Sequence, residues 1–215
     1  MNASPLGHLV STGRWLRYPP RCGTGNRLNG FTLFELMVVL AIAAILVTLA
    51  VPSLTRAIQI NTMASTVNTF LADMRYARSE SIRRGGGVIM CRSSSPEAVN
   101  AACNSDTSNS WKTGWIVFHD LDNSGARGSA EPVLRAHAPI ATVNTILAVG
   151  EASAFGFTAT GRLSRPSTTQ LHFGSDPVYA ADVQRTVCIN PGGYARVAID
   201  SDGRPTGNAS CSTAP

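Results

Sequence analysis

Residues 30–52 read GFTLFELMVVLAIAAILVTLAVP, and this stretch decides how the chain is built. Within it, residues 36–51 are sixteen in number and only Thr48 is polar. Counted from Phe31 the stretch is long enough to cross a hydrocarbon layer, because a helix of about 20 residues extends roughly 30 Å. Glu35 interrupts it. A carboxylate inside a membrane costs on the order of a few kcal/mol unless it is paired, so Glu35 is a functional candidate.

The basic charge of the chain lies before this stretch. Residues 1–30 hold four arginines and no acid, so without them the 18 bases and 13 acids become 14 and 13, and the net charge falls from +5 to +1. The positive-inside rule predicts that residues 1–30 lie in the cytoplasm and that the chain after Pro52 lies outside it. The remaining charge offers no strong field for nucleic acid. With 44% hydrophobic residues and one long apolar run, the chain is neither disordered nor a polytopic membrane protein.

Two simpler interpretations of the apolar run are a secretory signal peptide and a plain membrane anchor. A signal peptide is cut after small residues at its end, but Pro52 lies where cleavage after Ala50 would place the new chain. A plain anchor has no reason to hold Glu35 near its start. Neither interpretation accounts for the whole pattern.

Residues 30–35, Gly-Phe-Thr-Leu-Phe-Glu, followed by the apolar run and a proline, resemble a type IV prepilin signal. The resemblance implies that residues 1–30 are a leader, that a prepilin peptidase cuts after Gly30, and that Phe31 becomes the N-methylated mature terminus. It also implies that Glu35 acts in assembly by pairing with the terminal amine of a neighbouring subunit. The leader is longer than usual in this family, and whether Met1 is the true start stays open.

After Ser53 the apolar run changes into an amphipathic pattern. Apolar residues recur at spacings of three and four and predict one buried face of a helix, formed by Ile60, Met63, Val67, Phe70, Leu71, Met74 and Ala77. We interpret this stripe as packed core.

The same helix has a clear predicted end. Glu80 is followed by two arginines, which suit a helix C-terminus, and three glycines at 85–87 stop it. The sequence therefore predicts one helix from about Leu33 to Arg84 with a kink at Pro52. In this division residues 31–52 are the transmembrane or filament-core part, and residues 53–87 are an amphipathic helix that continues into a head.

Residues 88–215 change to the short alternating runs of a β domain. Candidate strands are separated by turn residues and lie at 88–91, 115–118, 133–135, 140–149, 155–158, 170–173, 186–189 and 194–199. Pro-Gly-Gly at 191–193 marks a hairpin between the last two. Many short strands predict an antiparallel sandwich. The fold class is thus α+β, a long N-terminal helix packed on a periplasmic β-sandwich head.

Short sequence segments at the end of the helix and in the head are similar to the GspH/FimT family of minor pilins and pseudopilins. The match rests on ARSESIRR at 77–84, VIMC at 88–91 and GWIVF at 114–118. It spans most of residues 31–200 and is weakest from 136 to 185. The resemblance implies the pilin-like fold, assembly with other pilin or pseudopilin subunits by an inner-membrane platform, and no enzymatic activity. No catalytic motif contradicts it, since the sequence has no GxSxG, HExxH or Walker pattern.

Two functions follow from this resemblance. The favoured one is an H-type minor pseudopilin of type II protein secretion, anchored in the inner membrane by a single pass and assembled into a pseudopilus. The alternative is a FimT-type minor pilin of type IV pili, with or without DNA binding for natural transformation. The sequence does not choose between them.

Four cysteines lie in the predicted head, at 91, 103, 188 and 211. An even number in an extracytoplasmic domain predicts disulfides, which four cysteines can form in three ways. The local pairing, Cys91 with Cys103 and Cys188 with Cys211, is the most economical. A metal site is the competing interpretation, but the spacing typical of zinc ligands is missing.

Asp120, Asp122, Ser124 and Glu131 meet the spacing of a calcium loop, with Gly125 at its sixth position. A strand before the loop and a proline after it do not suit an EF-hand. We therefore favour a polar β-turn held by side-chain hydrogen bonds and keep calcium as the alternative. No other cofactor is expected.

DNA binding has candidate residues in two loops. Some FimT-type pilins bind DNA through a C-terminal Gly-Arg-x-Arg motif, and the matching positions here are Gly193, Tyr194, Ala195 and Arg196, so a tyrosine replaces the first arginine. The second loop, residues 161–165, supplies Arg162 and Arg165. Tyrosine can stack on a base and arginine can contact phosphate. We favour the simpler interpretation, in which these side chains only face solvent.

Overall fold

The computed structural model describes residues 30–106, 110–150, 152–165, 169–174 and 178–211, and the predicted leader, apart from Gly30, lies outside them. The chain divides into two units, residues 1–45 and 46–215. One helix, α1 (Leu33–Arg84, 52 residues), contributes to both. Its bounds are those that the sequence predicts, and it continues through Pro52 rather than ending there.

The apolar half of α1 is long and apolar enough to cross a membrane. An 18-residue window has a mean hydropathy of 2.7, and none of it is buried within the structure. The second half ends as predicted. Arg83 and Arg84 both donate to Glu80, and these hydrogen bonds lower the pKa of Glu80 to about 2. Gly85, with φ of 82°, then turns the chain away from the helix.

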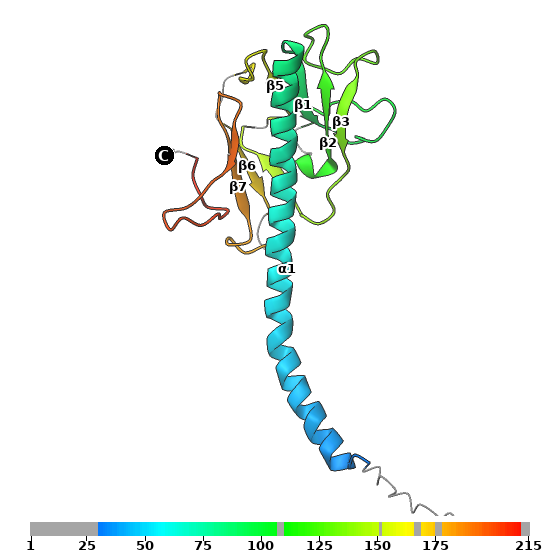
Figure 1. The fold of residues 1–215 in the computed structure, drawn as a ribbon, viewed down its shortest axis with the longest axis vertical. Coiled ribbons are helices and arrows are strands. Elements are labelled where there is room, and N and C mark those ends of the chain that lie inside the picture. The colour runs from blue at the N-terminus through cyan, green and yellow to red at the C-terminus, as the bar shows by residue number, and fades with distance from the viewer. Residues whose placement is uncertain (1–29, 107–109, 151, 166–168, 175–177, 212–215) are drawn as a thin grey trace, which may run out of the picture. The chain divides into compact units, whose positions relative to one another are not determined.

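In the described part of the chain, eight strands form two antiparallel sheets, and these lie beside α1 (Figure 1). The first sheet has the order β3-β2-β1-β5 and consists of β1 (Val88–Arg92), β2 (Trp115–His119), β3 (Val133–His137) and β5 (Ala154–Phe157). The second has the order β4-β6-β7-β8 and consists of β4 (Ile146–Ala148), β6 (Thr169–Phe173), β7 (Arg185–Ile189) and β8 (Ala195–Val197). A 3₁₀ turn, η1 (Trp111–Thr113), precedes β2. The predicted α+β pilin-like fold is therefore confirmed.

Two predicted strand ranges were too long. The range 140–149 is a strand only at Ile146–Ala148, and the range 194–199 only at Ala195–Val197. Ile140 and Val143 are buried all the same, because the loop that carries them packs into the core without joining a sheet. The backbone N–H of Ile140 is satisfied by the carbonyl of Lys112, at 2.7 Å.

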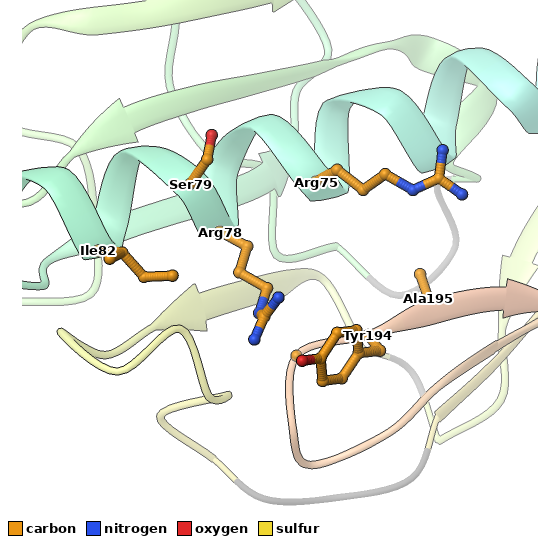
Figure 2. A pocket seen from close by; sticks show the side chains of 7 residues that line it. Arg75, Arg78, Ser79, Ile82, Tyr194 and Ala195 are labelled. Carbon is orange, nitrogen blue, oxygen red and sulfur yellow. The ribbon is translucent and has the colours of Figure 1, made fainter.

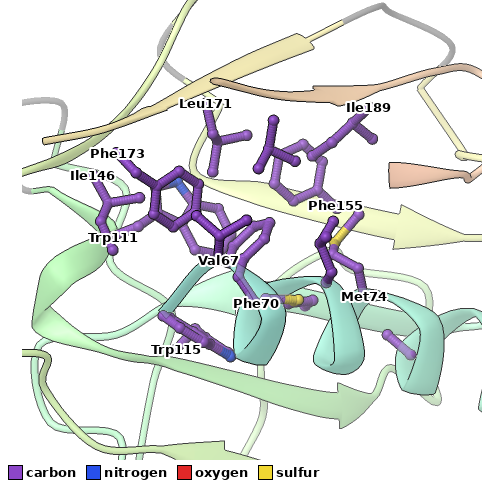
Figure 3. Packing of buried hydrophobic residues seen from close by; sticks show 14 of the residues in the cluster. Val67, Phe70, Met74, Trp111, Trp115, Ile146, Phe155, Leu171, Phe173 and Ile189 are labelled. Carbon is purple, nitrogen blue, oxygen red and sulfur yellow. The ribbon is translucent and has the colours of Figure 1, made fainter. Parts of the chain in front are cut away.

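The apolar stripe of α1 packs between the inner faces of both sheets (Figure 3). Phe70 is fully buried at the centre of this cluster. Its ring meets Trp115 of the first sheet edge-on, with centroids 5.4 Å apart, and Phe173 of the second sheet at 5.6 Å. It also meets Trp111 of η1 at 5.6 Å. Phe70 therefore contacts aromatic rings of both sheets. The prediction that the apolar stripe of α1 is packed core is confirmed.

One buried carboxylate joins α1 to the first sheet. Asp73 accepts a hydrogen bond from the indole N–H of Trp115 at 2.8 Å and pairs with Arg135 at 2.7 Å. Arg135 in turn lies over the ring of Tyr76, 4.0 Å from its centroid. The charge of Asp73 is thus compensated in place, as a buried charge must be.

The outer face of each sheet is covered by a loop that a disulfide holds. On the first sheet Cys91 joins Cys103, with Cα atoms 5.5 Å apart, and Ala101 packs beside them against Ile116 and Phe118. On the second sheet Cys188 joins Cys211 at 5.6 Å, beside Ala198 and Ala209. The structure therefore has the local pairing. Because these loops cover the outer faces of the sheets, β1 and β7 are buried along their whole length.

Removing these disulfides should destabilise the head. The bridges close loops with sequence separations of 12 and 23, and the chain-entropy model assigns about 3 kcal/mol to each. We expect paired Cys→Ser replacements, at 91 and 103 or at 188 and 211, to lower the free energy of unfolding by up to that amount in denaturant titrations. A reducing agent should have no further effect on the variant lacking both bridges. Peptide mapping that joins Cys91 to Cys188 would contradict the pairing.

Candidate functional site

Thr32 precedes α1 and caps its N-terminus. The Oγ1 of Thr32 accepts the backbone N–H of Glu35 at 3.1 Å, and its carbonyl accepts that of Leu36 at 3.1 Å. Glu35 therefore lies in the first turn, where the helix dipole favours an acid. The sequence analysis missed Thr32, although Thr-x-x-Glu is the spacing of a capping box and could have shown its role.

Gly30 and Phe31 precede the helix in an open position. Within the described part of the chain, no atom lies within 4 Å of where a side chain on Gly30 would project, and Phe31 is 86% exposed. Gly30 also does not have the positive φ that would demand glycine. Neither packing nor backbone geometry therefore requires glycine here, and a requirement for it would have to come from another protein. The processing roles of Gly30 and Phe31 and the assembly role of Glu35 stay predictions.

The loop between β2 and β3 brings three predicted calcium residues together. Carboxylate oxygens of Asp120, Asp122 and Glu131 lie within 4.8 Å of one another, and Asp120 and Glu131 are buried. Ser124 uses its hydroxyl differently, donating to the carbonyl of Ala126 at 2.9 Å.

The same carboxylates already serve the loop itself. Asp120 accepts the backbone N–H groups of Ser124 and Gly125 at 3.1 and 3.0 Å. Glu131 accepts those of Leu121 and Gly128 at 2.6 and 2.7 Å. Burial raises the pKa of Asp120, whereas hydrogen bonds from Ser124 lower the pKa of Asp122. The favoured polar turn accounts for this geometry, and calcium binding stays a prediction.

The two loops of the DNA hypothesis lie against each other. The backbone N–H of Leu163 donates to the carbonyl of Pro191 at 3.0 Å. A Cβ on Gly193 would lie 2.1 Å from the carbonyl oxygen of Gly161, and Gly193 has φ of +79°. Only glycine fits there, so Gly193 is what allows residues 161–165 and the β7–β8 hairpin to meet.

A small pocket forms where this hairpin faces α1 (Figure 2). Its volume is about 140 Å³, and its lining includes Arg75 and Arg78 of α1 and Tyr194 of the hairpin. The guanidinium of Arg78 lies 3.9 Å from the ring centroid of Tyr194, and its Nε donates to the carbonyl of Gly161 at 2.9 Å. Neither arginine was singled out from the sequence, because nothing in the local pattern of α1 marks what faces it across the head.

The predicted arginines differ in how they are placed. Arg162 and Arg165 are exposed, and Arg196 is half-buried. Tyr194 is 58% exposed, but one face of its ring is already covered by Arg78. DNA binding by these residues stays a prediction.

Comparisons with known proteins agree with this picture. The family model "Type II transport protein GspH" matches residues 66–193, which is more than half of the chain. A second model, the prokaryotic N-terminal methylation motif, matches residues 26–51. No curated protein sequence matches the chain significantly.

Two crystal structures of the Pseudomonas aeruginosa type IV minor pilin FimU, in different crystal forms, are similar in fold. One has a TM-score of 0.50 at 19% identity and covers 69% of this chain and 95% of that one. The other has a TM-score of 0.48 at 21% identity and covers 66% and 96%. At such low identity the likeness concerns the fold alone. With its methylation motif and GspH-type head, the chain belongs to the GspH family of minor pilins and pseudopilins.

Proposed function

We propose that this protein is an H-type minor pseudopilin of type II protein secretion. The observation that carries the proposal is the match of residues 66–193 to the type II transport protein GspH. Proteins of this family are structural subunits, and the part of the chain described here is consistent with such a role. The subunit is stored in the inner membrane by α1, with its head in the periplasm, and enters a filament that moves folded proteins outward.

The geometry of the first turn supports a specific role for Glu35 in that step. After cleavage behind Gly30, the new amine of Phe31 lies four residues from Glu35 along the chain. In a filament core the carboxylate needs a cation, and the terminal amine of a neighbouring subunit supplies one. At about 4 Å and an effective dielectric constant near 20, the attraction is about 4 kcal/mol before desolvation.

Glu35→Gln isolates this charge from the capping role. Glutamine also occupies this position in capping boxes, so the helix start is retained while the charge is lost. We expect a strain lacking the gene to recover secretion with the wild-type gene but not with Glu35→Gln. The variant should still be cleaved and remain in the membrane. Thr32→Ala is the matched control, because it weakens the cap by about 1 kcal/mol and keeps the charge. Normal filament entry of Glu35→Gln would contradict the pairing.

The second candidate is a minor pilin of type IV pili, with or without DNA binding. The observation in its favour is that residues 161–165 and the β7–β8 hairpin, which carry the candidate arginines, lie side by side, joined by the hydrogen bond from Leu163 to Pro191. The same deletion strain separates the two functions. Loss of exoprotein secretion with normal pili supports the secretion subunit, and loss of pili or of DNA uptake with normal secretion supports the pilus subunit.

A further inference from the structure

We propose that residues 178–182, in the connection between β6 and β7, form a membrane-contact edge that rests on phospholipid headgroups while the subunit is stored in the membrane. This inference rests on the membrane anchoring in the proposed function. It adds a second contact with the bilayer, made by the head itself.

An ion pair places this edge on α1. Asp182 pairs with Arg56, which is the first charged residue after the apolar run. Arg185 stabilises the turn that carries Asp182. Its guanidinium donates to the carbonyls of Asp182, Val183 and Gln184 at 2.6, 2.9 and 2.8 Å. Val183 is buried, so the turn is also fastened to the core. Asp182 is therefore held beside Arg56 by a defined structure.

The position of Arg56 along α1 sets the depth of Asp182. Arg56 follows Val51, the last residue of the apolar run, by five positions, which is about 7.5 Å along a helix. The headgroup layer on each side of a bilayer is roughly 5–8 Å thick, the difference between its full and hydrocarbon thicknesses. A helix that keeps residues 36–51 in the hydrocarbon layer thus carries Arg56, and with it Asp182, within or at the surface of the headgroup layer.

The side chains of this edge suit that layer. Val178 is apolar and 53% exposed. Tyr179 follows it, with its hydroxyl donating to the carbonyl of Thr142 at 2.7 Å. Tyrosine is enriched at membrane interfaces because it combines an apolar ring with a polar tip. On α1, Leu54 and Ile58 flank Arg56 and are 63% and 56% exposed. The edge and this part of the helix therefore both expose apolar groups.

The neutral charge of the ion pair predicts how the contact depends on lipid charge. The side chains of Arg56 and Asp182 are 62% and 43% exposed, and such pairs stabilise little in water. Headgroups that cover the pair would lower the local dielectric constant and strengthen it. Because the pair is neutral, the contact should not depend on the fraction of anionic lipid.

The test measures the depth of two labelled sites in the mature protein. Val178→Cys and Ile82→Cys each receive an environment-sensitive fluorophore, and the protein is reconstituted into phosphatidylcholine vesicles that carry a nitroxide on the headgroup. Ile82 is a matched control because it is 51% exposed and lies 26 residues beyond Arg56 on the same helix, roughly 39 Å along its axis. The four native cysteines of the head are in disulfides and do not react.

We expect the label at 178 to be quenched at least about twofold more than the label at 82, because only the former lies within reach of the headgroup layer. Adding phosphatidylglycerol should not change this ratio. Asp182→Asn should reduce quenching at 178, whereas Asp202→Asn, an exposed acid elsewhere in the head, should not. Equal quenching at both sites, in protein that floats with the vesicles, overturns the membrane-contact edge and leaves the anchor intact. Protein that does not float with the vesicles overturns the anchoring itself.

Discussion

Replacing Gly30 by leucine is expected to abolish processing, so that the protein keeps its leader and does not enter a filament. The structure separates this effect from misfolding. No described atom lies within 4 Å of where the new side chain would project, and α1 begins three residues later. The variant should therefore have a normally folded head and an intact precursor mass. The wild-type protein should begin at N-methylated Phe31.

Intact-mass spectrometry of the membrane fraction measures this outcome. Phe34→Leu is a suitable control, because Phe34 is 74% exposed and the substitution leaves the cleavage residue in place. A wild-type protein that keeps its leader, or that is cut after Ala50, would show that the prepilin interpretation of residues 30–35 is wrong.

Phe70→Ala should be the most destabilising single substitution in the head. Phe70 is fully buried and contacts aromatic rings of both sheets and of η1. Truncation of a buried phenylalanine costs about 3–5 kcal/mol in lost burial and cavity formation. Domains of this size are stable by only about 5–15 kcal/mol, so the variant should lose a large part of its stability.

Urea unfolding of the mature protein in detergent, followed by tryptophan fluorescence, reports this change directly. Trp111 and Trp115 both contact Phe70, and they are the tryptophans that remain once the leader is removed. Phe34→Ala is the control on the same helix and should leave the unfolding midpoint unchanged. A midpoint of Phe70→Ala equal to that of the control would show that the core does not depend on this bridge.

Features that depend on local periodicity could be predicted from the sequence. The course of α1, the buried stripe around Phe70 and the positions of most strands follow from which residues recur at spacings of two, three or four. The exception at 140–149 has a physical cause. Ile140 and Val143 are buried and look like strand residues, but the backbone N–H of Ile140 bonds to Lys112 of η1 rather than to a neighbouring strand.

The candidate functional residues could be predicted where they form a local sequence pattern. Residues 30–35 carry the processing and assembly hypotheses on their own, because a linear signal is read by an enzyme along the chain. The capping role of Thr32 could have been predicted from the Thr-x-x-Glu spacing in the same residues. The spacing of a calcium loop could also be recognised in the sequence. Spacing does not show, however, that Asp120 and Glu131 accept hydrogen bonds from backbone N–H groups of their own loop.

Only the tertiary structure decided which distant residues meet. Arg56 and Asp182 are 126 positions apart, Arg78 lies over Tyr194, and Gly193 is a glycine because the carbonyl of Gly161 leaves no room for a side chain. Periodicity states which face of a helix or strand is apolar, but not what covers it. The sequence by itself therefore determined a membrane-length helix, its processing signal and a β head. The packing of two sheets around one stripe of that helix decided the pocket, the ion pairs and the edge proposed to meet the membrane.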